Sequence, residues 1–290
     1  MQNRREFLET TGKIAGGITL ASLLTNNSWA GTTPTPFGIQ LYTLRDIIEP
    51  NKADIIGTLK QISKFGYKEI ESYDGPNGFL WGMTPKEFKK VIEDLGMKLV
   101  SSHCDIFQNF EKKVEDASSI GMKYLICPWL GPQKSIDDFK HYADQFNDKA
   151  AICAKHGIKF GYHNHDYGFK PIDNQLPQEV LLNNTDAKLV DFEMDIYWVV
   201  NAGHNPIEWF KKYPNRFKLC HVKDRSKTAI EDGSYPSVNL GTGNINFTSI
   251  LKEGKKYGLN KFFVEQEVYL NETPMDAAKA GASYMKNLGI

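Results

Sequence analysis

A short phrase recurs along this chain: a glycine, an apolar residue, a lysine or asparagine, and then an apolar run. It begins at Gly66, Gly96, Gly121, Gly157 and Gly258. Glycine just past a helix takes the left-handed conformation that closes the last turn at little steric cost. Each copy therefore indicates the end of a helix and the start of a buried strand. Strands that alternate with helices at this interval predict a parallel sheet.

Helical periodicity precedes these glycines, as in Ile55, Leu59, Ile62 and Phe65, which share one helix face. Eight strands are expected, at residues 37–41, 67–72, 98–103, 123–127, 159–163, 187–192, 217–222 and 261–264. Eight strand and helix units in residues 37–290 match a (β/α)8 TIM barrel in number and size. An open doubly wound sheet is the alternative, but residues 40–45 lack the glycine-rich turn that normally follows its first strand.

Four stretches in the second half of the chain place ionisable side chains two residues apart at expected strand ends. They are His163 with His165, Glu193 with Asp195, His221 with Lys223, and Glu265 with Glu267. Side chains two apart on a strand share a face, and TIM-barrel catalysis sits at the carboxyl ends of the strands. Imidazoles and carboxylates converging on one pocket predict a divalent metal site.

The first thirty residues differ from the rest. Arg4 and Arg5 precede a mildly apolar stretch, residues 14–24, and a small-residue end at Ala30. This pattern is typical of a twin-arginine signal peptide cleaved after about Ala30, and the apolar stretch is too short to span a bilayer. We therefore expect residues 1–30 to be the signal, 31–36 a flexible lead-in and 37–290 the barrel. The twin-arginine export machinery is then a partner, and the location is periplasmic.

Lysines plus arginines number 35 and aspartates plus glutamates number 35, so the formal net charge is zero. A neutral chain offers no broad basic face, so we expect no nucleic-acid partner. Aromatic residues beyond strand ends suit sugar rings, although core or loop packing is the alternative for each. The predicted substrate-binding residues are Tyr42, Trp81, Trp129 and Trp198, together with His103 at the end of the third strand.

The chain resembles the sugar phosphate isomerase/epimerase superfamily with the xylose isomerase-like TIM barrel. The resemblance rests on residues 40–45, 162–166, 195–198, 202–206, 221–224, 240–247 and 264–265. It implies one divalent ion held by strands five to eight, which on this chain means His163, Asp195, His221 and Glu265. His163 stands where the superfamily usually has a glutamate, and His165 is a competing ligand. Two imidazoles and two carboxylates favour Mn, Zn or Co over Mg.

The resemblance also implies chemistry by enolisation of a sugar or keto-sugar. An imidazole at position 163 disfavours two-base epimerisation, because a metal-bound histidine cannot replace a carboxylate base. The candidates for acid, base or electrostatic work are His165, Glu267, Lys223 and Glu71. Sugar phosphates are mainly cytoplasmic, so a periplasmic location favours a non-phosphorylated substrate.

Several activities remain open at this point. The first is an isomerase or epimerase-like enzyme, and the alternative is a keto-sugar lyase or dehydratase of the inosose dehydratase or 3-keto-glycoside lyase type. A non-catalytic periplasmic sugar-binding barrel is more remote, because spare ionisable residues favour an enzyme. The identity of the sugar and the metal stays open, as does a homo-oligomer.

Overall fold

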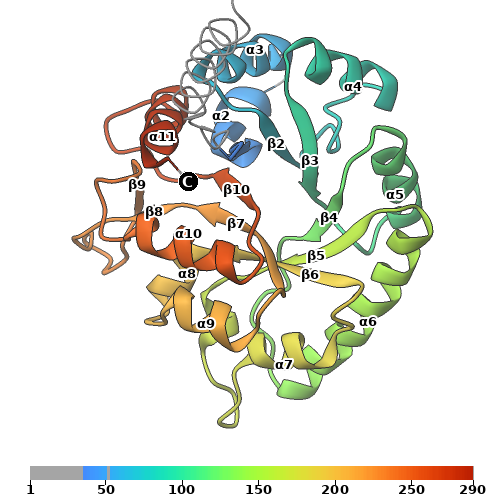
Figure 1. The fold of residues 1–290 in the computed structure, drawn as a ribbon, viewed down its shortest axis with the longest axis vertical. Helices are drawn as coiled ribbons and strands as arrows, with labels where there is room; N and C mark the ends of the chain where they lie inside the picture. The colour runs from blue at the N-terminus through green and yellow to red at the C-terminus, as the bar shows by residue number, and fades with distance from the viewer. Residues whose placement is uncertain (1–34, 51–52, 290) are drawn as a thin grey trace, which may run out of the picture. The chain divides into compact units, whose positions relative to one another are not determined.

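A computed structural model describes residues 35–50 and 53–289. The predicted signal peptide and most of the predicted lead-in lie outside these residues. Within the described part, eight parallel strands close into a barrel in the order β1-β10-β7-β6-β5-β4-β3-β2 (Figure 1). The (β/α)8 prediction is therefore confirmed. The strands are β1 Gly38–Gln40, β2 Glu69–Tyr73, β3 Lys98–His103, β4 Tyr124–Cys127, β5 Lys159–His163, β6 Val190–Asp195, β7 Phe217–Val222 and β10 Lys261–Val264.

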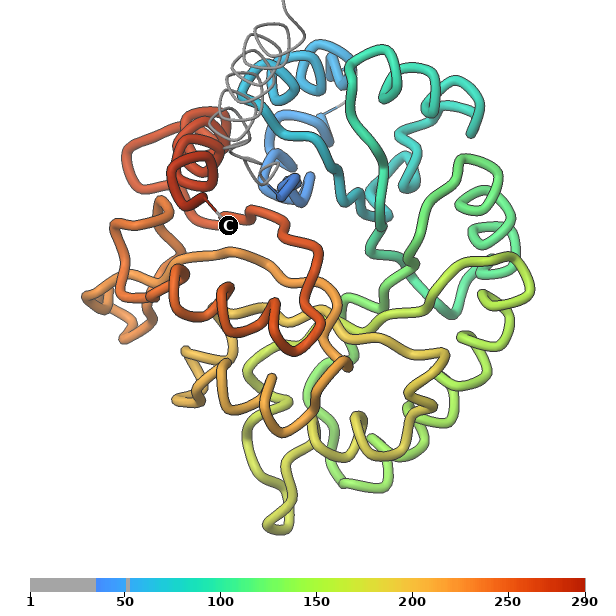
Figure 2. Tube along the Cα trace, viewed as in Figure 1, coloured from blue at the N-terminus to red at the C-terminus, as the bar shows by residue number. Residues whose placement is uncertain are grey.

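Helices surround the barrel and connect successive strands, as the chain trace in Figure 2 shows. They are η1 Leu41–Leu44, α2 Arg45–Ile48, α3 Ile55–Phe65, α4 Pro85–Asp94, α5 Phe110–Ser119, α6 Ile136–Lys155, η2 Asp166–Phe169, α7 Pro177–Asn184, α8 Ile196–Asn201, α9 Pro206–Lys212, α10 Phe247–Lys256 and α11 Pro274–Leu288. A two-stranded antiparallel sheet, β8 Asp224–Arg225 with β9 Ser237–Val238, projects after β7. None of the helices in the described part is long and apolar enough to cross a membrane.

The five glycines of the recurring phrase all have positive φ, as predicted. Gly66 caps α3 with φ 105°, and Gly157 follows α6 with φ 70°. After α6 the backbone N–H of Ile158 returns to the carbonyl of Cys153, which satisfies a group at the helix end and starts β5. The phrase thus fixes where each of these helices ends and where the next strand begins.

The sixth strand was predicted at residues 187–192 but lies at Val190–Asp195, so the prediction was early by three residues. The reason is a turn built on Asp186. Its carbonyl accepts hydrogen bonds from Leu189 N at 3.1 Å and Val190 N at 2.9 Å, and its carboxylate accepts one from Lys188 N. Glu193 and Asp195 consequently belong to the strand itself, where alternation directs both side chains to the same face.

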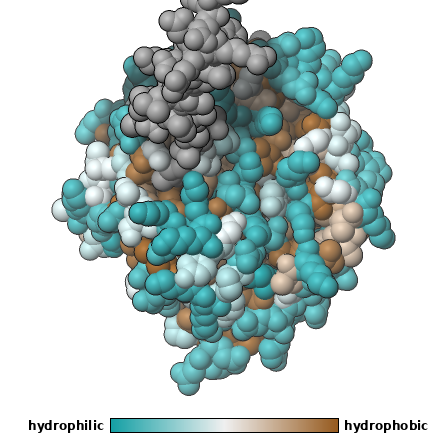
Figure 3. Space-filling view, in the orientation of Figure 1, coloured by the Kyte–Doolittle hydropathy of each residue, from teal (hydrophilic) through white to brown (hydrophobic). Residues whose placement is uncertain are grey.

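The apolar core has two parts. The larger part lies between the strands and the helices, and a small cluster consists of Val100, Ile126, Leu219 and Phe263. Leu219 lies two residues before His221 on β7, so the small cluster faces the barrel interior beneath that histidine. On the face drawn in Figure 3, hydrophilic side chains cover most of the periphery. Inside the barrel, the ionisable residues at the strand ends therefore lie above this small cluster of packed apolar side chains.

Candidate active site

The ionisable stretches meet because their strands are neighbours in register. His163 pairs with Glu193 across β5 and β6, and Asp195 pairs with His221 across β6 and β7. Glu265 follows the last residue of β10, which lies beside β7. The carboxyl ends of these strands therefore bring the predicted residues to one end of the barrel.

Three imidazoles converge on one oxygen of Glu193. His103 Nε2 lies 2.8 Å from Glu193 Oε2, His163 Nδ1 lies 3.1 Å from it and His221 Nε2 lies 3.3 Å from it. The other oxygen of Glu193 is buried and has no hydrogen-bond partner among the described residues. These four residues offer ligand-type atoms within 4.8 Å of one another.

A second group lies on the opposite edges of the same rings. His221 Nδ1 is 2.9 Å from Glu265 Oε2 and 3.8 Å from Asp195 Oδ2. His163 Nε2 is 3.7 Å from Asp195 Oδ2. Asp195, His221 and Glu265 form another set of ligand-type atoms within 4.8 Å of one another. The His163 and His221 rings therefore each present one nitrogen to Glu193 and the other to the group that contains Asp195.

Lys223 is a buried ammonium surrounded by carboxylates. Its Nζ lies 2.7 Å from Asp195 Oδ2, 3.0 Å from Glu265 Oε2 and 2.9 Å from Glu267 Oε1. Burial alone would lower the pKa of Lys223, but these three carboxylates raise the pKa well above its ordinary value. Lys223 is therefore held positively charged between β6, β7 and the segment after β10.

The electrostatics of the site show an excess of negative charge. Burial acts to lower the pKa of His221, yet Glu265 and Glu193 raise this pKa well above its ordinary value. Burial raises the pKa of Asp195 to about 6, against the opposing effect of Lys223. Carboxylates packed so closely in a dry site favour any cation that can bind them.

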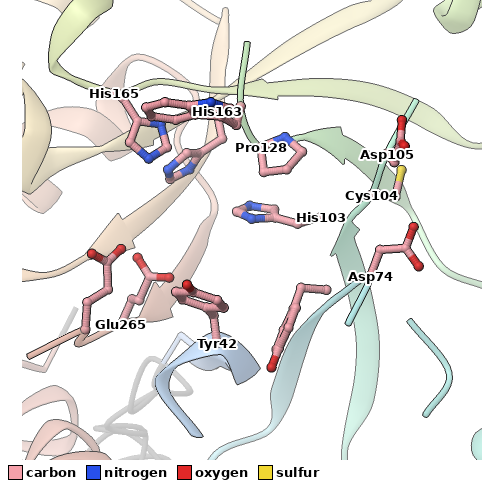
Figure 4. A pocket seen from close by; sticks show the side chains of 12 residues that line it. Tyr42, Asp74, His103, Cys104, Asp105, Pro128, His163, His165 and Glu265 are labelled. Carbon is pink, nitrogen blue, oxygen red and sulfur yellow. The ribbon is translucent and has the colours of Figure 1, made fainter. Parts of the chain in front are cut away.

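His163 and Glu265 of this cluster line one side of a cavity of about 400 Å³ (Figure 4). His165 lies at this side, with its ring centroid 4.5 Å from that of Trp129 and 5.0 Å from that of His163. Its Nδ1 is buried without a hydrogen-bond partner among the described residues. Burial, followed by the neighbouring His163, lowers the pKa of His165 well below its ordinary value. The imidazole is therefore neutral at physiological pH.

Most of the predicted site residues border this cavity: Tyr42, His103, Trp129, His163, His165, Glu265 and Glu267. Asp195, His221 and Lys223 lie directly behind them. Trp198 does not line the cavity, but its ring lies 5.3 Å from that of His165 and 5.2 Å from Lys223 Nζ. The structure thus brings most of the predicted site residues together at one end of the barrel.

Two predicted residues lie elsewhere than expected. Trp81 does not line the cavity: its side chain is buried, its Nε1 donates to Ser72 Oγ at 3.1 Å, and its ring packs on Tyr73. Glu71 lies inside the barrel rather than at the opening. Its Oε1 accepts from Gln40 and meets His221 Nε2 at 2.7 Å, and its Oε2 accepts from Ser101 at 2.6 Å. Both oxygens are engaged, so Glu71 orients His221 and does not reach a substrate.

Sequence reasoning missed residues at the carboxyl ends of β2, β3 and β4. Tyr73, Asp74, Cys104, Asp105 and Pro128 complete the cavity wall. Their position just after predicted strands was a usable signal, because the same rule had found the residues after strands five to eight. The central place of Glu193 was not visible in the sequence, because it depends on the register between β5 and β6.

The sequence profile of the xylose isomerase-like TIM barrel matches residues 59–288, which is most of the chain. This protein belongs to the family of xylose isomerase-like TIM barrels.

Individual relatives extend this picture. An inosose dehydratase from Clostridium perfringens (strain ATCC 13124) is 27% identical over 128 residues, which are 40% of this chain and 42% of the relative. The chain thus spans less than half of that curated relative. The crystal structure of a sugar phosphate isomerase/epimerase from Parabacteroides distasonis ATCC 8503 is 28% identical, with a TM-score of 0.72 and coverage of 90% of this chain and 96% of that one. The structure of the IOLI protein with a binding zinc atom is 16% identical, with a TM-score of 0.70, and covers 87% of this chain and 97% of that one.

Proposed function

We propose that this protein is a divalent-metal-dependent enzyme that acts on a sugar or keto-sugar by enolisation. One observation carries the proposal. Three buried imidazoles lie against the carboxylates of Glu193, Asp195 and Glu265, beside a cavity large enough for a small-molecule ligand. The buried carboxylates of Asp195 and Glu265 beside His221 fit a bound cation. The zinc in the IOLI structure, which shares this fold, supports the same interpretation.

The ligands that we propose are His163, Asp195, His221 and Glu265, as predicted from the sequence. A histidine that binds a metal usually donates its other ring N–H to a carboxylate. His221 fits this rule if Nδ1 binds the metal, since its Nε2 lies 2.7 Å from Glu71 Oε1. His163 fits it if Nε2 binds, since its Nδ1 lies 3.1 Å from Glu193 Oε2. Glu193 and Glu71 then orient the ligands and are not ligands themselves.

A divalent ion held there would polarise a carbonyl and an adjacent hydroxyl of the substrate. His165 is our choice for the base that removes the α-proton, because its imidazole is neutral and lines the cavity. Lys223 places a fixed positive charge behind the site and stabilises negative charge that develops on the substrate. Glu267 lines the cavity, and its side chain is 31% exposed, which suits it to a later proton transfer.

A β-elimination is the second candidate reaction, and the name of the C. perfringens relative, an inosose dehydratase, favours it. An enolised sugar expels a leaving group that lies β to the carbonyl. One metal site and one base could therefore serve either isomerisation or β-elimination. Asp74, Asp105, Glu265 and Glu267 line the cavity, and the lining residues within the described part include no lysine or arginine. This charge disfavours a phosphate group. The predicted export of the protein likewise favours a non-phosphorylated substrate.

Solvent exchange tests the proposed function. We expect the metal-loaded protein in D₂O to incorporate deuterium at the α-carbon of at least one member of a panel of sugars, keto-sugars and 3-keto-glycosides. His165→Ala should slow this exchange by about 100-fold or more with metal content unchanged, while the exposed His141→Ala should not slow it. A protein that binds sugars but exchanges no carbon-bound hydrogen is a binding barrel and contradicts the proposal. The products, isomers or unsaturated sugars, distinguish isomerase from lyase.

A further inference from the structure

β6 extends two residues beyond its pairing with β5. The last residue pair between these strands is His163 with Glu193, whereas β6 continues to Asp195. On its other side, Asp195 pairs with His221 of β7. Asp195 is fully buried, and buried main-chain groups are costly unless a hydrogen-bond partner reaches them. The side of Asp195 that faces β5 therefore needs a partner other than a paired strand residue.

The side chain of Asn164 supplies that partner. Its Oδ1 accepts a hydrogen bond from Asp195 N at 3.2 Å, and its Nδ2 donates one to the Asp195 carbonyl at 3.2 Å. Asn164 is fully buried, and its carboxamide offers a donor and an acceptor, as a peptide group does. Asn164 thus continues the attachment of β5 to β6 beyond the last backbone pair, and it does so directly after His163.

The carboxylate of Asp195 is held as well. Asp195 is the N-cap of α8, and its Oδ1 accepts at 3.2 Å from a backbone N–H in the first turn of that helix. Its Oδ2 lies 2.7 Å from Lys223 Nζ, 3.7 Å from His163 Nε2 and 3.8 Å from His221 Nδ1. With the main chain bound to Asn164 and Oδ1 bound to the helix, Oδ2 is the oxygen that faces the other proposed ligands.

We infer that Asn164 is a positioning residue of the metal centre. By bonding to both main-chain groups of Asp195, it fixes where the Asp195 carboxylate lies relative to His163, its own neighbour in sequence, and so presents Oδ2 to the cation. The inference rests on the proposed function, because it takes Asp195 and His163 as metal ligands. Asn164 itself does not line the cavity, so its role is to hold a ligand and not to contact the substrate.

Two substitutions of similar size remove this attachment. Asn164→Asp replaces the Nδ2 donor with an oxygen, which then faces the Asp195 carbonyl with no hydrogen to share. Asn164→Leu removes both hydrogen bonds. In each variant the main chain of Asp195 should be attached less firmly to β5.

Metal titration of the two variants tests the inference. We expect each to raise the dissociation constants for Co²⁺ and Zn²⁺ by about tenfold or more, measured by competition with a chelator of known affinity. The visible absorption spectrum of the Co²⁺ form should also change, because it reports the geometry of the ligands. In the metal-free protein, the amide hydrogen of Asp195 should exchange with solvent faster in Asn164→Leu than in the unmodified protein.

Asn147 provides a matched control. Its side chain makes the same pair of hydrogen bonds to main-chain groups, donating to Asn184 O at 3.0 Å and accepting from Asp186 N at 2.7 Å, but it lies on α6 in the outer layer of helices. Asn147→Asp and Asn147→Leu should leave both dissociation constants within twofold and the Co²⁺ spectrum unchanged. Thermal melts of all four variants compare the loss of stability at the two positions.

Unchanged metal affinity in folded Asn164→Asp would overturn the inference. An equal loss of affinity in the Asn147 variants would do the same, because the loss would then follow from general destabilisation. If Asn164→Leu fails to fold, Asn164→Asp decides the metal measurements.

The failure of the proposed function gives a different pattern. An unmodified protein that binds neither ion rejects the metal-dependent enzyme, and with it the role of Asn164. Metal binding that weakens as expected in the Asn164 variants, without hydrogen exchange into any sugar, keeps the role of Asn164 and rejects the enzyme. Hydrogen exchange by a metal-loaded protein whose Asn164→Asp variant binds metal equally well rejects only the role of Asn164.

Discussion

Glu193 is the residue on which the geometry of the site depends most. One of its oxygens lies within 3.3 Å of a nitrogen on each of three histidines, and its side chain is fully buried. The nearby imidazoles hold its pKa well below the ordinary value against the opposing effect of burial. A buried anion in this position fixes the rotation and the tautomer of His163 and His221, and so determines which ring nitrogens face Asp195 and Glu265.

Replacing this anion should weaken metal binding without unfolding the barrel. We expect Glu193→Gln to raise the dissociation constant for the divalent metal by about 10- to 100-fold, because the amide no longer fixes both ligand rings. The measurement is competition with a chelator of known affinity. Asp191→Asn is the matched control, since Asp191 is a buried carboxylate on the same strand but two residues further from the site. An affinity equal to that of the unmodified protein would contradict the orienting role of Glu193.

At the scale of single residues, sequence reasoning predicted which side chains converge wherever one rule of fold geometry sufficed. His163, Asp195, His221 and Glu265 all come together because parallel strands end at the same side of a barrel. It failed for Trp81, which follows β2 but lies in a turn with φ 57° that packs the indole on Tyr73. Loop residues are positioned by their own turns, and the spacing from a strand end does not specify those turns.

At the scale of elements, the boundary between helix and strand is set by the glycine phrase. All five glycines have the positive φ that the phrase predicted, and the strands that follow begin within three residues of them. The sixth strand has no such glycine before it, and this is where the predicted bounds shifted by three residues. The Asp186 turn provides the boundary there through side-chain hydrogen bonding, a local signal that apolar patterning does not reveal.

The glycine at the end of α6 provides a test of this account. No heavy atom lies within 4 Å of a Cβ placed on Gly157, so an added methyl group meets no steric obstacle and only the backbone conformation resists it. We expect Gly157→Ala to destabilise the protein by about 1 kcal/mol. The melting temperature of a domain this large should then fall by about 2–4 °C. The melting temperature of Gly157→Asn should fall less, because asparagine tolerates the left-handed region of backbone conformation. An unchanged melting temperature in Gly157→Ala would contradict the assignment.

At the scale of the whole molecule, barrel closure makes the site. Glu71 on β2 and His221 on β7 are 150 positions apart in sequence, yet their side chains meet inside the barrel at 2.7 Å. The fold class and the end of the barrel that carries the site were predictable, since both follow from the alternation of strands and helices. The partners of each side chain were not, because they depend on strand register and on how inward-facing residues share a limited volume.

The central claim is that the buried cluster holds a divalent metal, and metal content measures it most directly. Protein purified without chelator should contain roughly one equivalent of Mn, Zn or Co by plasma mass spectrometry, because its imidazoles and carboxylates suit these ions. His221→Ala removes a ring that both ligand groups share and should bring the content below about a tenth of an equivalent. His156→Ala, at an exposed residue that caps the end of α6, should retain the metal. Protein that folds and melts normally but carries no stoichiometric divalent metal, or a His221→Ala variant with full metal content, would contradict the account.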